Sequence, residues 1–211
     1  APYGEVWELQ KIIHERVAAG ALEDTWIVVE HDPVVTLGRN AQRTNVLLAP
    51  EVLAARGVGY FDIERGGDVT YHGPGQVVVY PIRRLERFRG IVPLVRTLEG
   101  AAIEACAHYG IVAERWSEHA GVWVGRKQIC AVGLAVRKMT SFHGIALNAC
   151  TDLSYDRLIT PCGLPDRGIT SLSAEAGRTV GYDEAKDVLM SMLASTFGVT
   201  FEPARREELT A

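Results

Sequence analysis

The sequence contains few cysteines and no recognisable metal-binding spacing. Its 211 residues include four cysteines, none in a CxxC pair: Cys106, Cys130, Cys150 and Cys162. A chain of this length with so few cysteines is not typical of a secreted disulfide scaffold, so reduced thiols are expected. The six histidines include no i,i+4 pair and no HExxH motif. The sequence therefore predicts no metal site.

The chain also lacks a long apolar run and an excess of positive charge. No segment approaches the roughly 20 apolar residues that a membrane span needs, and the first ten residues do not resemble a signal peptide. Lys and Arg total 22 against 26 Asp and Glu, a formal net charge of −4, whereas nucleic-acid binders are usually basic. We expect a cytoplasmic protein that binds neither membranes nor nucleic acids.

The sequence does contain clear helix and strand patterns. Apolar spacing predicts three helices, each followed by a glycine, over residues 6–17, 94–109 and 183–197. β-branched runs predict strands over residues 25–30, 34–36, 60–63, 76–81, 111–114, 121–124, 129–137 and 142–149. Several of these strands follow one another without a helix, which favours an α/β (α+β) fold with a mixed sheet packed by helices. We expect a single domain over residues 1–211.

The most unusual segment is RGGDVTYHGPGQ, residues 65–76. Its glycines permit positive φ and a close approach of backbone to ligand. Arg65 and His72 flank the turn and are placed to face one cavity. The segment is neither a P-loop nor a GxGxxG motif. The alternative is an ordinary hairpin turn rich in Gly and Pro.

A second segment, TPCGLP over residues 160–165, places Cys162 between Pro161 and Gly163. A nucleophilic cysteine needs exposure and a nearby base or cation, and neighbouring backbone N–H groups can receive an oxyanion. The alternative for any cysteine is a small buried hydrophobe. That interpretation fits Cys106, on a predicted helix, better than Cys162.

A third segment, GRKQICAVG over residues 125–133, carries Lys127 and Gln128 into an apolar strand. Regular alternation puts Arg126, Gln128 and Cys130 on one face and Lys127 on the other. A lysine that faces a closed site has a lowered pKa and can exchange protons with a thiol. The alternative is a solvated turn with ordinary surface charges.

A fourth segment, FHGIALN over residues 142–148, has small residues at Gly144 and Ala146. These leave room for a slender ligand on a strand, and Asn148 is suited to hold a loop or a carbonyl. The alternative is a core strand whose histidine is satisfied internally.

Together RGGDVTYHGPGQ, the AVG at 131–133, SFHGIALN at 141–148 and PCGLPDRGITSL at 161–172 resemble the lipoyl(octanoyl) transferase family. The resemblance implies a mixed sheet with a small second sheet, as in biotin and lipoate protein ligases. It implies that an octanoyl group passes from an acyl carrier protein, through a cysteine thioester, to a lysine of a lipoyl domain in 2-oxoacid dehydrogenase and glycine cleavage proteins. It implies no cofactor.

The same resemblance assigns site residues. The nucleophile is Cys162. The acyl and pantetheine cleft is lined by Arg65, Gly66, Gly67, Asp68, Val69, Thr70, Tyr71, His72, Ala131, Val132, Gly133, Gly144, Ile145 and Ala146. The family's catalytic lysine stands five residues before Gly133, which is Gln128 here. We assign the role to Lys127, one residue upstream, which a β-bulge would turn inward.

Other functions are weighed against this one. An ATP-dependent lipoate or biotin protein ligase would share the scaffold, but the sequence lacks a GRGRxxR-type loop. Gln128 leaves open a catalytically impaired adaptor that binds an acyl carrier. A cysteine peptidase would need His72 or His143 beside the cysteine. Because acyl carriers are acidic, we also expect a basic docking patch, for which the candidates are Arg83, Arg84, Arg87 and Arg89.

Overall fold

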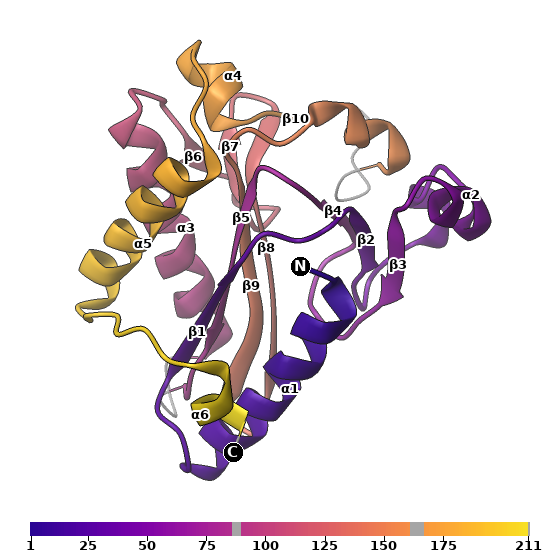
Figure 1. The fold of residues 1–211 in the computed structure, drawn as a ribbon. Helices are drawn as coiled ribbons and strands as arrows, with labels where there is room; N and C mark the ends of the chain where they lie inside the picture. The colour runs from indigo at the N-terminus through magenta and orange to yellow at the C-terminus, as the bar shows by residue number, and fades with distance from the viewer. Residues whose placement is uncertain (86–89, 161–166, 211) are drawn as a thin grey trace.

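The computed structural model describes residues 1–85, 90–160 and 167–210, and this part of the chain folds around two sheets (Figure 1). The large sheet has the order β1-β5-β9-β8-β7-β6, with β10 beside β8. Its strands are β1 (Thr25–Val29), β5 (Gln76–Ile82), β6 (Glu114–Arg115), β7 (Val122–Val124), β8 (Lys127–Arg137), β9 (Thr140–Asn148) and β10 (Gly168–Ile169). The small sheet, in the order β3-β2-β4, contains β2 (Val34–Leu37), β3 (Gly59–Asp62) and β4 (Val69–His72). The predicted mixed sheet with a small second sheet is confirmed.

The three predicted helices are confirmed as α1 (Tyr3–Ala19), α3 (Ile91–His108) and α5 (Tyr182–Phe197). The shorter helices were not predicted, because one or two turns give too few residues for a periodic pattern. These are α2 (Pro50–Ala55), α4 (Leu172–Ala176), α6 (Arg206–Thr210) and the 3-10 segments η1 (Arg43–Asn45) and η2 (Leu153–Leu158). Within the described ranges, no helix combines the length and apolar content needed to cross a membrane.

Helices cover both faces of the large sheet (Figure 1). On one face, α3 and α5 bury Leu98 and Leu189 in the main core, together with Val77 and Ile145 from the sheet. On the other face, α1 packs Ile13 against Phe142 of β9. The half of that face that α1 leaves uncovered is where β4 and the small sheet approach.

Two expectations about strands need correction. The predicted strand at 111–114 is wrong except for its last residue, because Ile111 turns into the main core directly after α3 and β6 begins only at Glu114. The hairpin alternative for residues 65–76 is also wrong. The segment contains β4, which pairs with β2, whereas β5 pairs with β1 and β9. Residues 73–75 therefore connect two sheets, and a Cβ on Gly75 would lie 2.7 Å from the Cys150 carbonyl carbon.

Candidate active site

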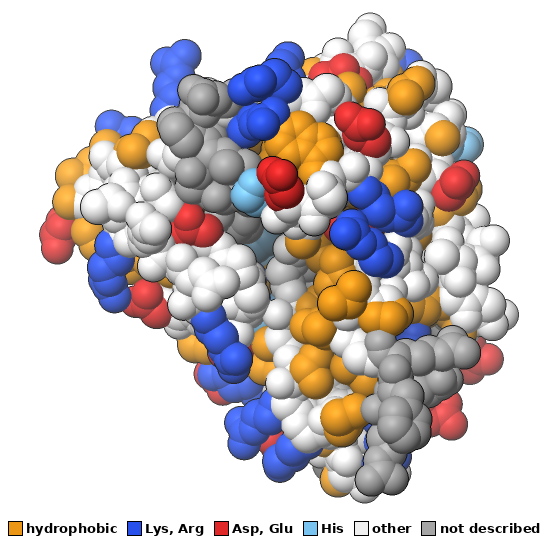
Figure 2. All heavy atoms as spheres, turned by 180° about the vertical axis from the view of Figure 1, so that it is seen from behind, with side chains coloured by type: hydrophobic (Ala, Val, Ile, Leu, Met, Phe, Trp, Pro, Cys, Tyr) orange, Lys and Arg blue, Asp and Glu red, His pale blue; other side chains and the backbone are white. Residues whose placement is uncertain are grey.

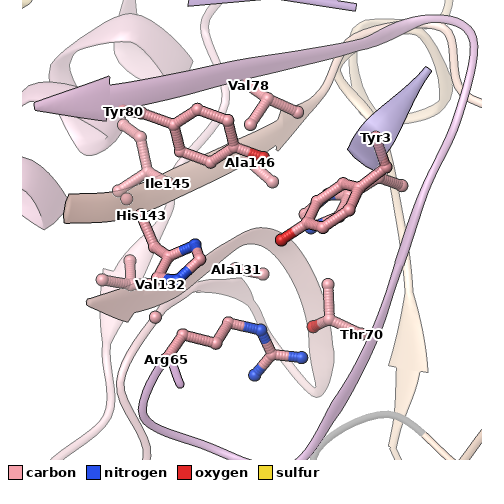
Figure 3. Close-up of a pocket in the computed structure, with 13 residues that line it drawn as sticks. Tyr3, Arg65, Thr70, Val78, Tyr80, Ala131, Val132, His143, Ile145 and Ala146 are labelled. Atoms are coloured by element: carbon pink, nitrogen blue, oxygen red, sulfur yellow. The ribbon is translucent and has the colours of Figure 1, made fainter. Parts of the chain in front are cut away.

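A pocket opens on the large sheet where strands β5, β9 and β8 run side by side (Figure 3). The register pairs Ala146 with both Val78 and Ala131, and pairs Gly133 with Gly144. Four of these five residues are Gly or Ala, so their small side chains leave a trough along the sheet surface. The pocket encloses about 350 Å³ of empty space, including its mouth. Small residues of three neighbouring strands therefore contribute to its lining.

The two glycines of the trough are required by close contacts. A Cβ on Gly144 would lie 2.0 Å from the carbonyl oxygen of Val79, on the neighbouring strand. A Cβ on Gly133 would lie 3.0 Å from Cδ of Arg65 and 3.1 Å from the Gly66 carbonyl oxygen. Gly133 thus makes room for the stem of Arg65, which enters the pocket from the segment before β4.

Arg65 places a buried cation at the pocket, since its side chain is only 6% exposed. Its Nη2 donates to the Thr36 carbonyl at 2.7 Å and to Thr36 Oγ1 at 3.0 Å, and its Nη1 donates to the Gly66 carbonyl at 3.0 Å. Hydrogen-bond acceptors of this kind are what a buried guanidinium needs. The arrangement fixes the positive charge beside the trough.

Buried aromatic and histidine side chains form another wall of the pocket (Figure 3). Tyr3, at the start of α1, stacks on His72 with ring centroids 6.2 Å apart. Tyr80 lines the pocket, and its hydroxyl lies 2.8 Å from Nε2 of His31. Burial raises the pKa of both tyrosines and lowers the pKa of His72 to about 3 and that of His31 to about 4. This wall is therefore uncharged around neutral pH.

His143 reaches the pocket through an unusual backbone conformation. Its φ is +56° in the middle of β9, a region that costs a non-glycine residue about 1–3 kcal/mol. The side chain is 1% exposed, its Nε2 lies 3.6 Å from Glu64 Oε2, and it has no hydrogen-bond partner among the described residues. His143 is therefore a buried residue beside Glu64 that also lines the pocket. Positive φ in a strand is not readable from the sequence.

Of the predicted cleft residues, nine line the pocket and five do not. The lining residues are Arg65, Thr70, His72, Ala131, Val132, Gly133, Gly144, Ile145 and Ala146. The other five are Gly66, Gly67, Asp68, Val69 and Tyr71. Sequence reasoning missed Tyr3, Val78 and Tyr80, which come from segments outside the motifs.

The five residues outside the pocket have other contacts. Val69 and Tyr71 alternate with the pocket-facing residues of β4, and they pack into the core of the small sheet. Asp68 accepts hydrogen bonds from the backbone N–H of Gln42 and from Nδ2 of Asn45, so it braces a neighbouring loop. The Gly67 carbonyl accepts from Asn40 N–H at 3.2 Å. These residues shape the segment that carries Arg65 and His72.

Strand β8 contains an irregularity next to Lys127. Gln128 pairs with Trp123 and Cys130 with Val122, so Ile129 is an extra residue in β8. Ile129 and Cys130 both enter the main core, which contradicts the expected alternation of faces through this segment. A bulge in this position is what we expected from the sequence, as a way to turn the Lys127 side chain to the other face of the strand.

Lys127 and Gln128 have different surroundings. Lys127 is exposed, and its Cγ lies 3.6 Å from the position of a Cβ built on Gly168 of β10. Gln128 is 5% exposed, and its Nε2 would lie 2.7 Å from a Cβ on Gly121. The expected burial of Lys127 is therefore not seen, while Gln128 is buried away from the residues that line the pocket.

The cysteines divide into distinct environments. Cys106 and Cys130 are fully buried in the main core, where burial raises the pKa of Cys106 to about 12 and also raises that of Cys130. Cys150 is exposed and follows the end of β9. Cys162 lies outside the described residues.

The residues that flank the cysteine segment are held at two different places. On the N-terminal side, Thr160 N–H donates to the Asn45 carbonyl at 2.7 Å, beside the small sheet. On the C-terminal side, Gly168 and Ile169 pair with Lys127 and Gln128. Thr160 and Gly168, which flank the residues that are not described, therefore lie beside the small sheet and at the bulged end of β8 respectively.

No metal site accompanies this arrangement in the described ranges. They contain no group of three or more His, Cys, Asp or Glu side chains that could hold a metal ion.

Comparison with known proteins adds independent information. Residues 2–194 match the lipoyl protein ligase A/B catalytic domain. The chain belongs to this family. Curated relatives are octanoyltransferases. The octanoyltransferase of Bacteroides fragilis (strain YCH46) is 42% identical to this chain over 199 residues, which cover 89% of this chain and 90% of that protein. The octanoyltransferase of Nitratidesulfovibrio vulgaris (strain DSM 19637 / Miyazaki F) is 43% identical over 197 residues, covering 92% and 90%.

Solved structures show which known fold this chain shares. A lipoate-protein ligase A bound with ATP superimposes with a TM-score of 0.74 at 16% identity, covering 96% of this chain and 87% of that one. A putative lipoate protein ligase from T. acidophilum, with bound lipoic acid, gives a TM-score of 0.72 at 16% identity, covering 96% and 88%. The predicted lipoate-ligase-like fold is confirmed for this lipoyl protein ligase A/B family member.

Proposed function

We propose that this protein is an octanoyltransferase of lipoate biosynthesis, which moves an octanoyl group from an acyl carrier protein to a lysine of a lipoyl domain. The observation that carries the proposal is the trough of small side chains across β5, β9 and β8, lined in large part by the motifs that resemble this family. Each methylene buried there contributes about 0.8 kcal/mol. The curated relatives named octanoyltransferase, at 42% and 43% identity, support the same activity.

Cys162 is the proposed nucleophile. Cys106 and Cys130 are poor candidates because a buried thiol with a raised pKa is rarely a thiolate. Transfer from the carrier thioester to an enzyme thioester is nearly isoenergetic and needs no ATP. A covalent acyl-enzyme then predicts ping-pong kinetics.

Lys127 is the proposed partner of Cys162. The family lysine stands five residues before the strand glycine, and Lys127 stands six before Gly133. The bulge at Ile129 adds one residue to β8, so Lys127 takes the place that a bulge-free strand gives to the family lysine. Its side chain lies beside Gly168, only six residues after Cys162. Gln128 cannot act as a base near neutral pH.

The acceptor lysine must attack as a neutral amine. In the second half-reaction Lys127 takes the proton from this amine while the bond between the octanoyl carbonyl carbon and Cys162 breaks. The product is an amide, which is more stable than the thioester and draws the transfer forward.

The partners follow from this chemistry. The donor is an acyl carrier protein, the acceptors are lipoyl domains of 2-oxoacid dehydrogenase and glycine cleavage proteins, and the setting is the cytoplasm. Residues 1–211 act as one catalytic domain. Arg83, one candidate for the basic docking patch, forms an ion pair with Asp24 at 3.3 Å. Two other candidates, Arg87 and Arg89, lie outside the described residues. On the face in Figure 2, basic side chains are interspersed with acidic ones.

The ATP-dependent ligase alternative is not favoured. The curated relatives carry the name octanoyltransferase, and the lipoate ligases share only 16% identity with this chain. An impaired adaptor that binds an acyl carrier without turnover is separated from an enzyme by the following experiment.

The protein is incubated with octanoyl-carrier and its intact mass is measured, followed by addition of a lipoyl domain. We expect a gain of one octanoyl group, lost again as the lipoyl domain is modified. Cys162→Ser abolishes the gain, whereas Cys150→Ser, which removes the exposed cysteine among the described ones, leaves it unchanged. Acylation that persists in Cys162→Ser would refute the nucleophile, and binding of the carrier without any acyl gain or transfer would favour the adaptor.

A further inference from the structure

Three buried side chains connect the pocket to the residue that follows β10. His72 Nδ1 lies 2.6 Å from Gln76 Oε1, Gln76 Nε2 lies 2.8 Å from Asn148 Oδ1, and Asn148 Nδ2 lies 2.9 Å from the Thr170 carbonyl oxygen. His72, Gln76 and Asn148 are each less than a tenth exposed. Asn148 thus holds a carbonyl, as the sequence predicted. Thr170 N–H in turn donates to the Gln128 carbonyl at 2.9 Å, next to Lys127.

The direction of every hydrogen bond in this network is fixed by its last member. The Thr170 carbonyl can only accept, so Asn148 donates to it and turns its own oxygen toward Gln76. The amide nitrogen of Gln76 then donates to that oxygen and to the Tyr71 carbonyl at 3.3 Å. The oxygen of Gln76 therefore faces His72, whose Nδ1 must carry the hydrogen. The lone pair of the ring is left on Nε2.

The surroundings of His72 keep its ring neutral. The groups that face it are Tyr3 from α1, His31 from the β1–β2 connection, Arg65 from the segment before β4, and His143 from β9. None is a carboxylate. Burial, reinforced by His31, lowers the pKa of His72 to about 3. No described residue donates a hydrogen bond to Nε2, so His72 contributes an open acceptor to the pocket wall.

We propose that Gln76 and Asn148 are positioning residues that hold His72 as a hydrogen-bond acceptor for the amine of the acceptor lysine. The inference rests on the proposed function. An octanoyl chain has no N–H or O–H to donate, whereas the attacking neutral amine has two N–H groups. One of these protons passes to Lys127 as the C–N bond forms and the bond to the Cys162 sulfur breaks. The other stays on nitrogen and is held by Nε2 of His72.

The first half-reaction involves no amine, so this role affects only the second. In Gln76→Glu, a carboxylate beside Nδ1 raises the pKa of His72 and favours the imidazolium, whose Nε2 donates instead of accepting. We expect octanoyl transfer to the lipoyl domain to slow by about 10- to 100-fold at neutral pH. Acyl-enzyme formation stays within about threefold, and the transfer rate recovers as pH rises through the new pKa.

Gln76→Leu is the matched variant without a charge. This substitution removes the hydrogen bond that keeps the hydrogen on Nδ1 of His72, but it leaves the ring neutral. The rate of octanoyl transfer therefore falls and does not recover at higher pH. A merely structural role would give the two variants the same pH profile. The wild type is tested directly by the ring-nitrogen chemical shifts of ¹⁵N-histidine, assigned with His72→Gln, which we expect to report a neutral Nδ1–H ring.

An Nε2–H tautomer in the wild type would overturn the inference, as would equal losses in both half-reactions for both variants. A wild type that forms no acyl-enzyme at all would overturn the proposed function and this inference together, so the two failures are distinguishable.

Discussion

The two halves of strand β8 carry different parts of the candidate site and differ in regularity. From Ala131 to Arg137 the strand pairs residue by residue with β9. From Lys127 to Cys130 it meets β7 and β10, reaches β9 only at Cys130, and contains an extra residue. The regular half contributes to the trough that we propose for the acyl chain, and side-chain alternation there is simple. The bulged half carries the proposed base, where alternation fails.

Binding an acyl chain and transferring a proton place different requirements on a strand. A chain-binding trough needs a flat row of small side chains, which an unbroken ladder supplies with period two. A proton-transferring lysine must instead be aimed at one sulfur atom, and bulges are a known means of re-aiming a side chain beside an active site. The comparison can be tested by changing one half of the strand at a time.

The largest effect is expected at the bulged half. Lys127→Ala removes the proposed base, and octanoyl transfer should fall by about 10²- to 10⁴-fold. Lys127→Arg should fall by a similar factor, because a guanidinium keeps the charge but does not give up its proton near neutral pH. Single-turnover transfer from pre-formed acyl-enzyme measures both. A rate unchanged in Lys127→Ala would show that this lysine is not the base, and Gln128→Lys would then test the adjacent position.

The regular half of β8 and the part of β9 that pairs with it should respond to substitution through the free energy of unfolding. In Gly144→Ala, the new Cβ would meet the Val79 carbonyl oxygen at 2.0 Å, and backbone cannot move aside cheaply. We expect a loss of about 3 kcal/mol in the free energy of unfolding. Gly133→Ala meets the Arg65 stem at 3.0 Å and should cost only about 1 kcal/mol. Urea denaturation of the two variants checks the order, and equal losses would contradict the difference in contacts.

The positions of pocket residues in the regular part of the sheet could be predicted from the sequence, whereas those in the bulged half of β8 could not. Gly144 and Ala146 were predicted at the pocket because their spacing on a strand and their small side chains are visible in the chain, whereas Gly133 was assigned through the family resemblance. Tyr3 and Tyr80 were missed because only the tertiary fold brings α1 and β5 to the trough.

Backbone conformation accounts for the other errors. His143, which the sequence did not place at the pocket, lines it and has a positive φ. The extra residue at Ile129 reverses the expected faces of the strand before it. Neither feature changes the composition or spacing from which sequence arguments are made. The three long helices were predicted because their apolar faces repeat over several turns.

Low pH should lower the free energy of unfolding through the buried, uncharged histidine His31, which contacts Tyr80 in the pocket wall. Burial lowers the pKa of His31 from 6.5 to about 4, so the unfolded chain binds a proton that the folded chain excludes. The contribution to stability is complete above pH 6.5 and is lost as pH falls toward 4. We expect the free energy of unfolding to drop by about 2 kcal/mol at about pH 5 from this residue alone. His31→Gln should flatten that slope, and an unchanged slope would contradict the assignment.

The smallest effect on the transfer rate is expected for a deletion in the bulged half, and it tests most directly what the bulge does. Deletion of Gln128 gives the order Lys-Ile-Cys-Ala-Val-Gly, with lysine five residues before Gly133, and removes the need for a bulge. If the bulge only compensates for one extra residue, Lys127 keeps its place opposite Val124 and beside Gly168. The transfer rate should then stay within about tenfold of wild type, roughly 1.4 kcal/mol in activation free energy. A loss as large as that of Lys127→Ala would mean that the bulge itself aims the lysine.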